Sequence, residues 1–174
     1  MFKSRQIFNF DFLFDDISNK YDIFDWESFN DKAKKYEVVA TDVITGESKF
    51  FDKNNCSDII SAVKASASMP VMSKMIDVEG RKYLDGGIST SIAYKRAFDV
   101  GYSKAIVVLT REEGYRKKPA NKINESIYKR YFKPLPNLVE KLMTVPERYN
   151  KMQEEMEELA KEGKILIIRP QNKV

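Results

Sequence analysis

The chain contains no histidine and only one cysteine among its 174 residues. The lack of histidine excludes a Ser-His-Asp or Cys-His catalytic site, a His-ligated zinc and a histidine pH switch, because each needs an imidazole. Any acid–base chemistry must then use carboxylates, lysines or tyrosines. The single Cys56 cannot form an intrachain disulfide or a thiolate metal cluster, which predicts a reducing, cytoplasmic setting.

Long apolar runs are also lacking. The longest is Ala105–Leu109, far short of the eighteen or so residues that cross a membrane. The N-terminal stretch interleaves aromatics with Asn and Asp and does not resemble a signal peptide. With 43% apolar and 32% charged residues, the composition is that of a globular protein. We expect one cytoplasmic domain over 1–174, with at most a peripheral position at a membrane, and a basic, helical region over 112–174.

Charge is distributed unevenly, although the formal net charge is only +4. Residues 1–58 hold 8 Lys and Arg against 12 Asp and Glu, whereas residues 111–133 hold 8 Lys and Arg against 3 Glu. Blocks of this kind are most often solvated surfaces, and a basic block can also bind an anionic partner. The acidic residues over 11–25 lack the spacing of a calcium loop, so we expect no metal and no cofactor.

Hydrophobic periodicity predicts an α/β fold with a mixed sheet. We expect hairpin strands over 36–43 and 47–51, a second hairpin over 75–78 and 81–84, and buried strands over 104–110 and 164–168. Helices are expected over 59–68, capped by Asn55 or Ser57, and over 89–100, 122–132 and 147–162. The alternating aromatics Phe8, Phe10, Phe12 and Phe14 predict an extended segment that packs on the core or, alternatively, covers an apolar site as a flap.

The most specific feature is Asp85-Gly86-Gly87, which follows a predicted strand directly. Two glycines let the backbone turn sharply and allow another segment or a substrate to approach. A carboxylate at this point would be presented to solvent and could act as a general base. An isolated Asp-Gly-Gly can equally be a turn that serves only the backbone.

Four segments in order resemble the patatin-like phospholipase family, in its bacterial form. They are Val38-Val-Ala-Thr-Asp-Val43, Ala65-Ser-Ala-Ser-Met-Pro70, Tyr83-Leu-Asp-Gly-Gly-Ile88 and Ala105-Ile-Val-Val-Leu-Thr-Arg111 with Gly114-Tyr-Arg116. The resemblance implies a three-layer α/β fold and hydrolysis of carboxylic esters in lipids by a Ser-Asp dyad that needs no histidine. It implies that Asp85 is the dyad aspartate and that Gly86 and Gly87 shape the turn presenting it.

The chain departs from that family at the nucleophile. The family's serine lies in a Gly-x-Ser-x-Gly motif after a glycine-rich oxyanion loop, and none of the seven glycines forms either motif. The nearest serine, Ser89, is expected to cap a helix, while Ser66 and Ser68 are expected to serve helix packing. The resemblance therefore implies the C-terminal portion of a lipid acyl hydrolase, incomplete at its N-terminal side and inactive alone.

Several partners follow from these features. The resemblance implies an acyl lipid substrate. Cations mixed with aromatics suit an anionic membrane surface, and the same mixture suits nucleic acid, which we do not expect here. An incomplete sheet would leave an open edge for self-association. The alternative function is a non-catalytic module that binds anionic membranes or a partner chain. The cations expected at a lipid surface are Arg116, Lys117, Lys118, Lys129 and Arg130.

Overall fold

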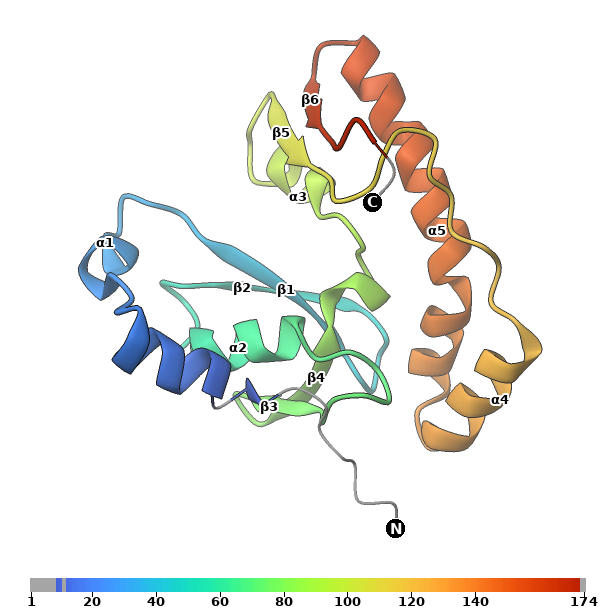
Figure 1. Ribbon diagram of the computed structural model, residues 1–174, viewed down its shortest axis with the longest axis horizontal. Coiled ribbons are helices and arrows are strands. Elements are labelled where there is room, and N and C mark those ends of the chain that lie inside the picture. Colours follow the sequence, from blue (N-terminus) through green and yellow to red (C-terminus); the bar gives the residue numbers. More distant parts are fainter. Residues whose placement is uncertain (1–8, 11, 173–174) are drawn as a thin grey trace. The chain divides into compact units, whose positions relative to one another are not determined.

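The computed structural model describes residues 9, 10 and 12–172, and its contacts divide the chain into two compact units (Figure 1). Unit 1 comprises residues 1–90 and 126–142, and unit 2 comprises residues 91–125 and 143–174. Among the described residues, no helix is both long enough and apolar enough to cross a membrane.

Unit 1 is built on a four-stranded antiparallel sheet with the strand order β2-β1-β4-β3. Its strands are β1 (Glu37–Asp42), β2 (Ser48–Asp52), β3 (Ile76–Val78) and β4 (Arg81–Asp85). Both hairpins predicted from the sequence are confirmed. β1 also pairs with β4, in a register that places Ala40 opposite Asp85. This long-range pairing brings the Asp-Gly-Gly turn against the first hairpin.

Helix α2 (Ile59–Ser66) packs against all four strands, and Figure 1 shows it beside them. Its buried Ala62 and Ala65 let it approach closely and share a core with Phe51, Val78 and Tyr83. The predicted cap is wrong, because the helix is capped by Asp58, whose carboxylate accepts a hydrogen bond from the Ser61 N–H at 3.0 Å. Asn55 and Ser57 lie outside the first turn.

A second core cluster in unit 1 contains Leu84, the next residue along β4 after Tyr83. Neighbouring residues of a strand point to opposite faces, so Tyr83 and Leu84 bury opposite faces of the sheet. The second cluster also contains Phe132, Leu138 and Leu142 from the 126–142 segment. β4 is therefore covered on both faces of the sheet.

The aromatic N-terminal segment is helical where the structure describes it. A π-helix, η1, spans Phe12–Tyr21 and is followed by α1 (Trp26–Asn30). The prediction of an extended segment is wrong for Phe12 and Phe14, and Phe8 lies outside the described residues. Phe10 is buried and contacts Phe14 edge to face, a contact that a helical turn permits and an extended strand does not.

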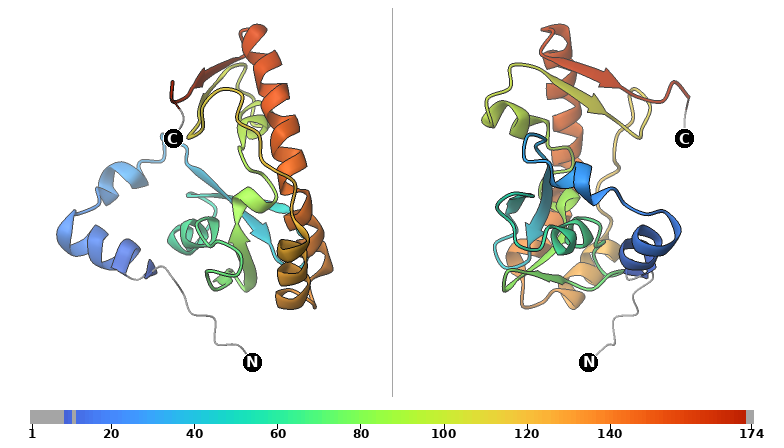
Figure 2. Two further views of the ribbon diagram at one scale, coloured as in Figure 1. Left: turned by 45° about the vertical axis from the view of Figure 1, so that its right-hand side comes forward. Right: turned by 90° about the vertical axis from the view of Figure 1, so that its left-hand side faces the viewer.

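Unit 2 contains a parallel pair of strands, β5 (Ala105–Val108) and β6 (Ile165–Ile168), which lie side by side in Figure 2. The molecule is an α/β protein with both antiparallel and parallel strand pairing, arranged in two sheets. The expected burial of these strands is only half correct. One face packs in a core with Tyr94 and Met156, while the other face is exposed.

The helices of the C-terminal half differ from the predicted ranges. α3 spans Tyr94–Asp99 and α4 spans Lys122–Tyr131, so α3 begins five residues later than expected and α4 is confirmed. α5 spans Pro136–Lys161 and continues through Pro146, whereas the predicted helix begins only at residue 147. A proline inside a helix costs about 3 kcal/mol, and burial of side chains along both halves of α5 compensates that cost.

Candidate functional site

Asp85 is the last residue of β4, and the short 3₁₀ turn η2 (Gly86–Ile88) begins directly after it. Its backbone N–H donates to the carbonyl of Ser68 at 2.9 Å, and its Oδ1 accepts a 2.7 Å hydrogen bond from the Gly87 N–H. The side chain is only half-buried. The strand thus presents one partly accessible carboxylate whose orientation is set by the turn that follows.

Gly86 is required by a close approach of two backbones. A Cβ at this position would overlap the carbonyl oxygen of Val39 and lie 2.8 Å from its carbonyl carbon, and these backbone atoms cannot move aside without shifting β1. A Cβ at Gly87 would lie 3.1 Å from the Asp85 Oδ1, so that position is tight but less severely restricted. The first glycine of the motif therefore seats the turn against β1, and the second leaves room for the Asp85 carboxylate.

Four hydroxyl groups form a chain of hydrogen bonds behind this turn. Thr41 Oγ1 donates to the Asp85 carbonyl at 2.8 Å and lies 2.8 Å from Ser89 Oγ. Ser48 Oγ donates to Ser89 Oγ at 2.9 Å and lies 2.6 Å from Thr90 Oγ1. Because each hydroxyl has one proton, Thr90 donates to Ser48, Ser48 to Ser89, and Thr41 to Asp85. The Ser89 proton is shared between Thr41 Oγ1 at 2.8 Å and the Gly86 carbonyl at 3.4 Å.

This chain explains the role of Ser89. Its hydroxyl accepts from one neighbour and donates to another, and its backbone N–H donates to Thr41 Oγ1 at 3.2 Å. The predicted helix cap is wrong: α3 begins later, after Ala93, which makes no side-chain cap hydrogen bond. A serine held in this way stabilises the turn. Ser68, the other serine of interest, is fully buried and donates to the carbonyl of Lys64 at 2.8 Å, as expected for helix packing.

The five cations expected at a lipid surface fall in different parts of the fold. Arg116, Lys117 and Lys118 lie in the loop of unit 2, whereas Lys129 and Arg130 lie in the last turn of α4, within unit 1. All except Lys117 are exposed. Lys117 is half-buried, with its Nζ 4.4 Å from the centre of the Tyr149 ring, so its charge interacts with an aromatic face of its own unit.

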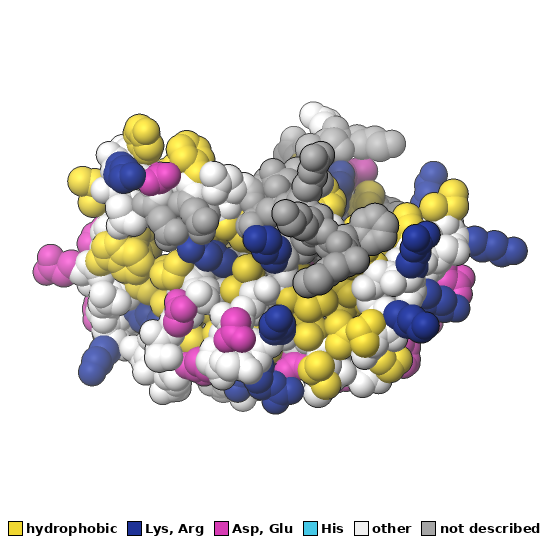
Figure 3. All heavy atoms as spheres, turned by 90° about the horizontal axis from the view of Figure 1, so that it is seen from below, with side chains coloured by type: hydrophobic (Ala, Val, Ile, Leu, Met, Phe, Trp, Pro, Cys, Tyr) yellow, Lys and Arg dark blue, Asp and Glu magenta, His cyan; other side chains and the backbone are white. Residues whose placement is uncertain are grey.

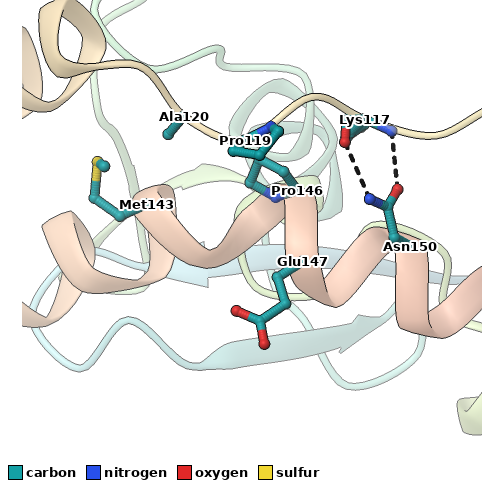
Figure 4. Close-up of a pocket in the computed structure, with 7 residues that line it drawn as sticks. All are labelled: Lys117, Pro119, Ala120, Met143, Pro146, Glu147 and Asn150. Atoms are coloured by element: carbon teal, nitrogen blue, oxygen red, sulfur yellow. Dashed lines mark hydrogen bonds between the residues drawn. The ribbon is translucent and has the colours of Figure 1, made fainter.

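The loop after β5 is fastened to α5 by one amide side chain. Asn150 Oδ1 accepts from the Lys117 N–H at 2.8 Å, and its Nδ2 donates to the Lys117 carbonyl at 3.0 Å (Figure 4). A cavity of about 450 Å³ lies beside this contact. Pro119 of the loop and Pro146 of α5 both line it, and the Glu147 carboxylate points away from the loop (Figure 4).

Sequence reasoning singled out Asp85, Gly86 and Gly87 as candidates but missed Thr41 and Ser48, whose hydroxyls form the chain beside them. Thr41 lies in β1 and Ser48 in β2, more than thirty residues before Asp85. The β1–β2 register pairs them, and the β1–β4 register brings them to the turn. The described residues contain no group of three or more Cys, Asp or Glu side chains placed to hold a metal ion.

Comparison with known families identifies one similar segment. Residues 135–174 match the model of a family described as Domain of unknown function (DUF6363), and this match covers α5 and β6. No curated protein matches the chain. The match lies outside residues 36–116, where the motifs of the Asp85 site occur. The chain is therefore similar to the DUF6363 family over its last 40 of 174 residues.

Proposed function

We propose that this chain is the C-terminal part of a patatin-like lipid acyl hydrolase and that Asp85 is the aspartate of its Ser-Asp dyad. The observation that carries the proposal is the half-buried Asp85 carboxylate at the end of β4, oriented by the Gly87 N–H at 2.7 Å. A general base needs to be accessible and held in one orientation, and this carboxylate meets both requirements.

The reaction would be hydrolysis of a carboxylic ester in a lipid. The serine hydroxyl attacks the ester carbonyl while Asp85 takes its proton. The tetrahedral intermediate then collapses to an acyl-serine as Asp85 returns the proton to the leaving alcohol. Water, activated by Asp85, hydrolyses the acyl-serine and restores the serine. The serine would come from a polypeptide segment with the Gly-x-Ser-x-Gly motif, which these 174 residues do not contain. Ser89 does not replace it, because its hydroxyl is part of the chain that ends on the Asp85 carbonyl. The chain alone is expected to be inactive.

The test begins with the reading frame upstream of Met1. A Gly-x-Ser-x-Gly segment there would allow the extended protein to be assayed with a short-chain p-nitrophenyl ester. We expect Asp85→Asn to lower the hydrolysis rate by roughly 10²- to 10⁴-fold, as removal of a general base does. The control is Asp77→Asn, because Asp77 is an exposed aspartate on β3 of the same sheet. Activity that survives Asp85→Asn, or an upstream frame without the motif, would refute the proposal.

The second candidate is a non-catalytic module that binds an anionic membrane surface. It is favoured by the exposure of Arg116, Lys118, Lys129 and Arg130. Figure 3 shows Lys and Arg side chains projecting from the surface on the face that it draws. Each such charge near an anionic bilayer contributes about 1 kcal/mol to binding. Flotation with vesicles that contain phosphatidylserine should retain the chain, and equal retention by neutral vesicles would exclude this electrostatic mode.

A further inference from the structure

The outer face of the β5–β6 pair is an exposed block of four aliphatic side chains. Ile106 and Val108 are 68% and 71% exposed on β5, and Leu166 and Ile168 are 59% and 49% exposed on β6. The register places Ile106 opposite Leu166 and Val108 opposite Ile168, so the four form a continuous two-by-two surface. The alternate residues Val107 and Ile165 are buried on the other face. Both faces of these strands are therefore apolar, and within the described part of the chain only one is covered.

Parallel strands are normally covered on both faces, and a two-stranded sheet is marginally stable by itself. Among residues 9, 10 and 12–172, β5 and β6 pair only with each other. Four aliphatic side chains exposed to this degree leave on the order of 400 Å² of apolar surface, the size of patch that often marks an interaction site on a monomeric protein.

We propose that this outer face, formed by Ile106, Val108, Leu166 and Ile168, is a homodimer interface in which two copies of the chain pack face to face. An uncharged aliphatic surface is complementary to a copy of itself, as a two-fold symmetric interface requires. This inference concerns the face of the pair and does not depend on the proposed hydrolase function.

The surrounding charges favour one orientation of the two copies. Lys104 and Lys164 precede the two strands and lie at the same end of the face. If the strands of the two copies ran in the same direction, four lysines would meet and repel one another. A two-fold axis that lies in the interface and runs across the strands makes them antiparallel. It places the two lysine pairs at opposite ends, so the four lysines do not meet.

The area predicts a weak dimer. Two such faces bury about 800 Å² in total, below the usual size of a specific interface, so a dissociation constant in the micromolar range or weaker is expected. A lipid bilayer is a poorer occupant, because it would leave the backbone donors and acceptors at the two outer strand edges without hydrogen-bond partners in an apolar medium.

The test is sedimentation velocity of the whole chain at concentrations from about 1 μM to about 500 μM. We expect the apparent mass to rise from the 20.2 kDa monomer towards the dimer. Ile106→Lys on β5 and Leu166→Lys on β6 should each weaken dimerisation at least tenfold. The control is Ile123→Lys, because Ile123 is 70% exposed on α4 and lies outside the face. Circular dichroism and urea unfolding establish that the variants fold.

Three results would overturn the proposal. The first is a wild-type chain that stays monomeric at the highest concentration. The second is an Ile123→Lys variant that loses dimerisation as much as Ile106→Lys does. The third is a monomeric wild type that binds phosphatidylcholine vesicles through this face, with binding lost in Ile106→Lys, which would assign the surface to a membrane.

Discussion

The hydroxyl of Thr41 donates a 2.8 Å hydrogen bond to the backbone carbonyl of Asp85, although the two residues are 44 positions apart in the chain. Thr41 lies on β1 and is fully buried, whereas Asp85 ends β4 and is half-exposed. The bond ties the interior of the sheet to the residue that presents its carboxylate at the Asp-Gly-Gly turn. Four predictions test this turn and the second unit.

Thr41→Val should destabilise unit 1 by about 1–3 kcal/mol, because the Asp85 carbonyl and the Ser89 N–H would lose a buried partner while the side-chain shape is kept. The free energy of unfolding in urea measures this. Thr110→Val, at an exposed threonine of unit 2, should change it by less than about 0.5 kcal/mol. Equal effects from the two substitutions would show that the hydroxyl chain contributes nothing.

Gly86→Ala should destabilise unit 1 by about 2–4 kcal/mol, since the new Cβ would overlap the Val39 carbonyl oxygen and must displace β1 or the turn. The matched control is Gly80→Ala. Gly80 has a φ of +81°, but an added Cβ would meet no atom within 4 Å, so only backbone strain of about 1–2 kcal/mol is expected there. Urea unfolding of both variants separates a clash from strain, and a larger loss for Gly80→Ala would contradict the close approach assigned to Gly86.

Acid should weaken unit 2 partly through Glu155. Its Oε2 lies 2.6 Å from Lys95 Nζ and accepts a 2.7 Å hydrogen bond from the Tyr94 hydroxyl. Two hydrogen bonds lower the pKa of the Glu155 carboxyl below its usual 4.5. The bond from Lys95 has the larger effect and the bond from Tyr94 the smaller one. This stabilisation is present above pH 4.5 and is lost as the pH falls through the lowered folded-state pKa, because the unfolded chain binds the proton first.

Glu155→Gln should therefore lose less stability than the wild type between about pH 5 and about pH 3. Urea unfolding at a series of pH values measures the difference. Glu154→Gln, at an exposed neighbour on α5, serves as the control and should follow the wild-type pH dependence. Identical pH dependence in Glu155→Gln and the wild type would contradict the role assigned to this carboxylate.

Asn150→Ala should release the loop after β5 from α5, because it removes both hydrogen bonds to the Lys117 backbone. The loop carries Arg116 and Lys117, both sites for trypsin, so the rate of tryptic cleavage there should rise several-fold. Glu147→Ala removes a side chain that lines the same cavity without fastening the loop and should leave cleavage unchanged. Mass spectrometry of the fragments identifies the cut, and unchanged cleavage in Asn150→Ala would count against this attachment.

Local patterns predicted much of the fold. Both hairpins, α4 and the parallel strands follow from residue periodicity and from the glycines at the turns, because these features depend on neighbours a few positions away. The failures have tertiary causes. Local sequence favours Ser89 as a helix cap, but Thr41 and Ser48 hold its hydroxyl. A helix that starts after Pro146 is the local expectation, but packing along α5 carries the helix through the proline. The aromatics of η1 alternate as in a strand but pack as a helix.

The amino-acid sequence by itself determined which chemistry is open to this protein: no imidazole, one cysteine, and an aspartate followed by two glycines. These are properties of composition and of adjacent residues, so no folding is needed to know them. Only the tertiary structure decided that Gly86 lies against Val39 and that a chain of four hydroxyls leads through Thr41 to the Asp85 carbonyl. It also decided that no described residue covers one face of β5–β6. Each of these depends on strand register and on packing between residues distant in the chain, and side-chain hydrogen bonds and burial follow from that register.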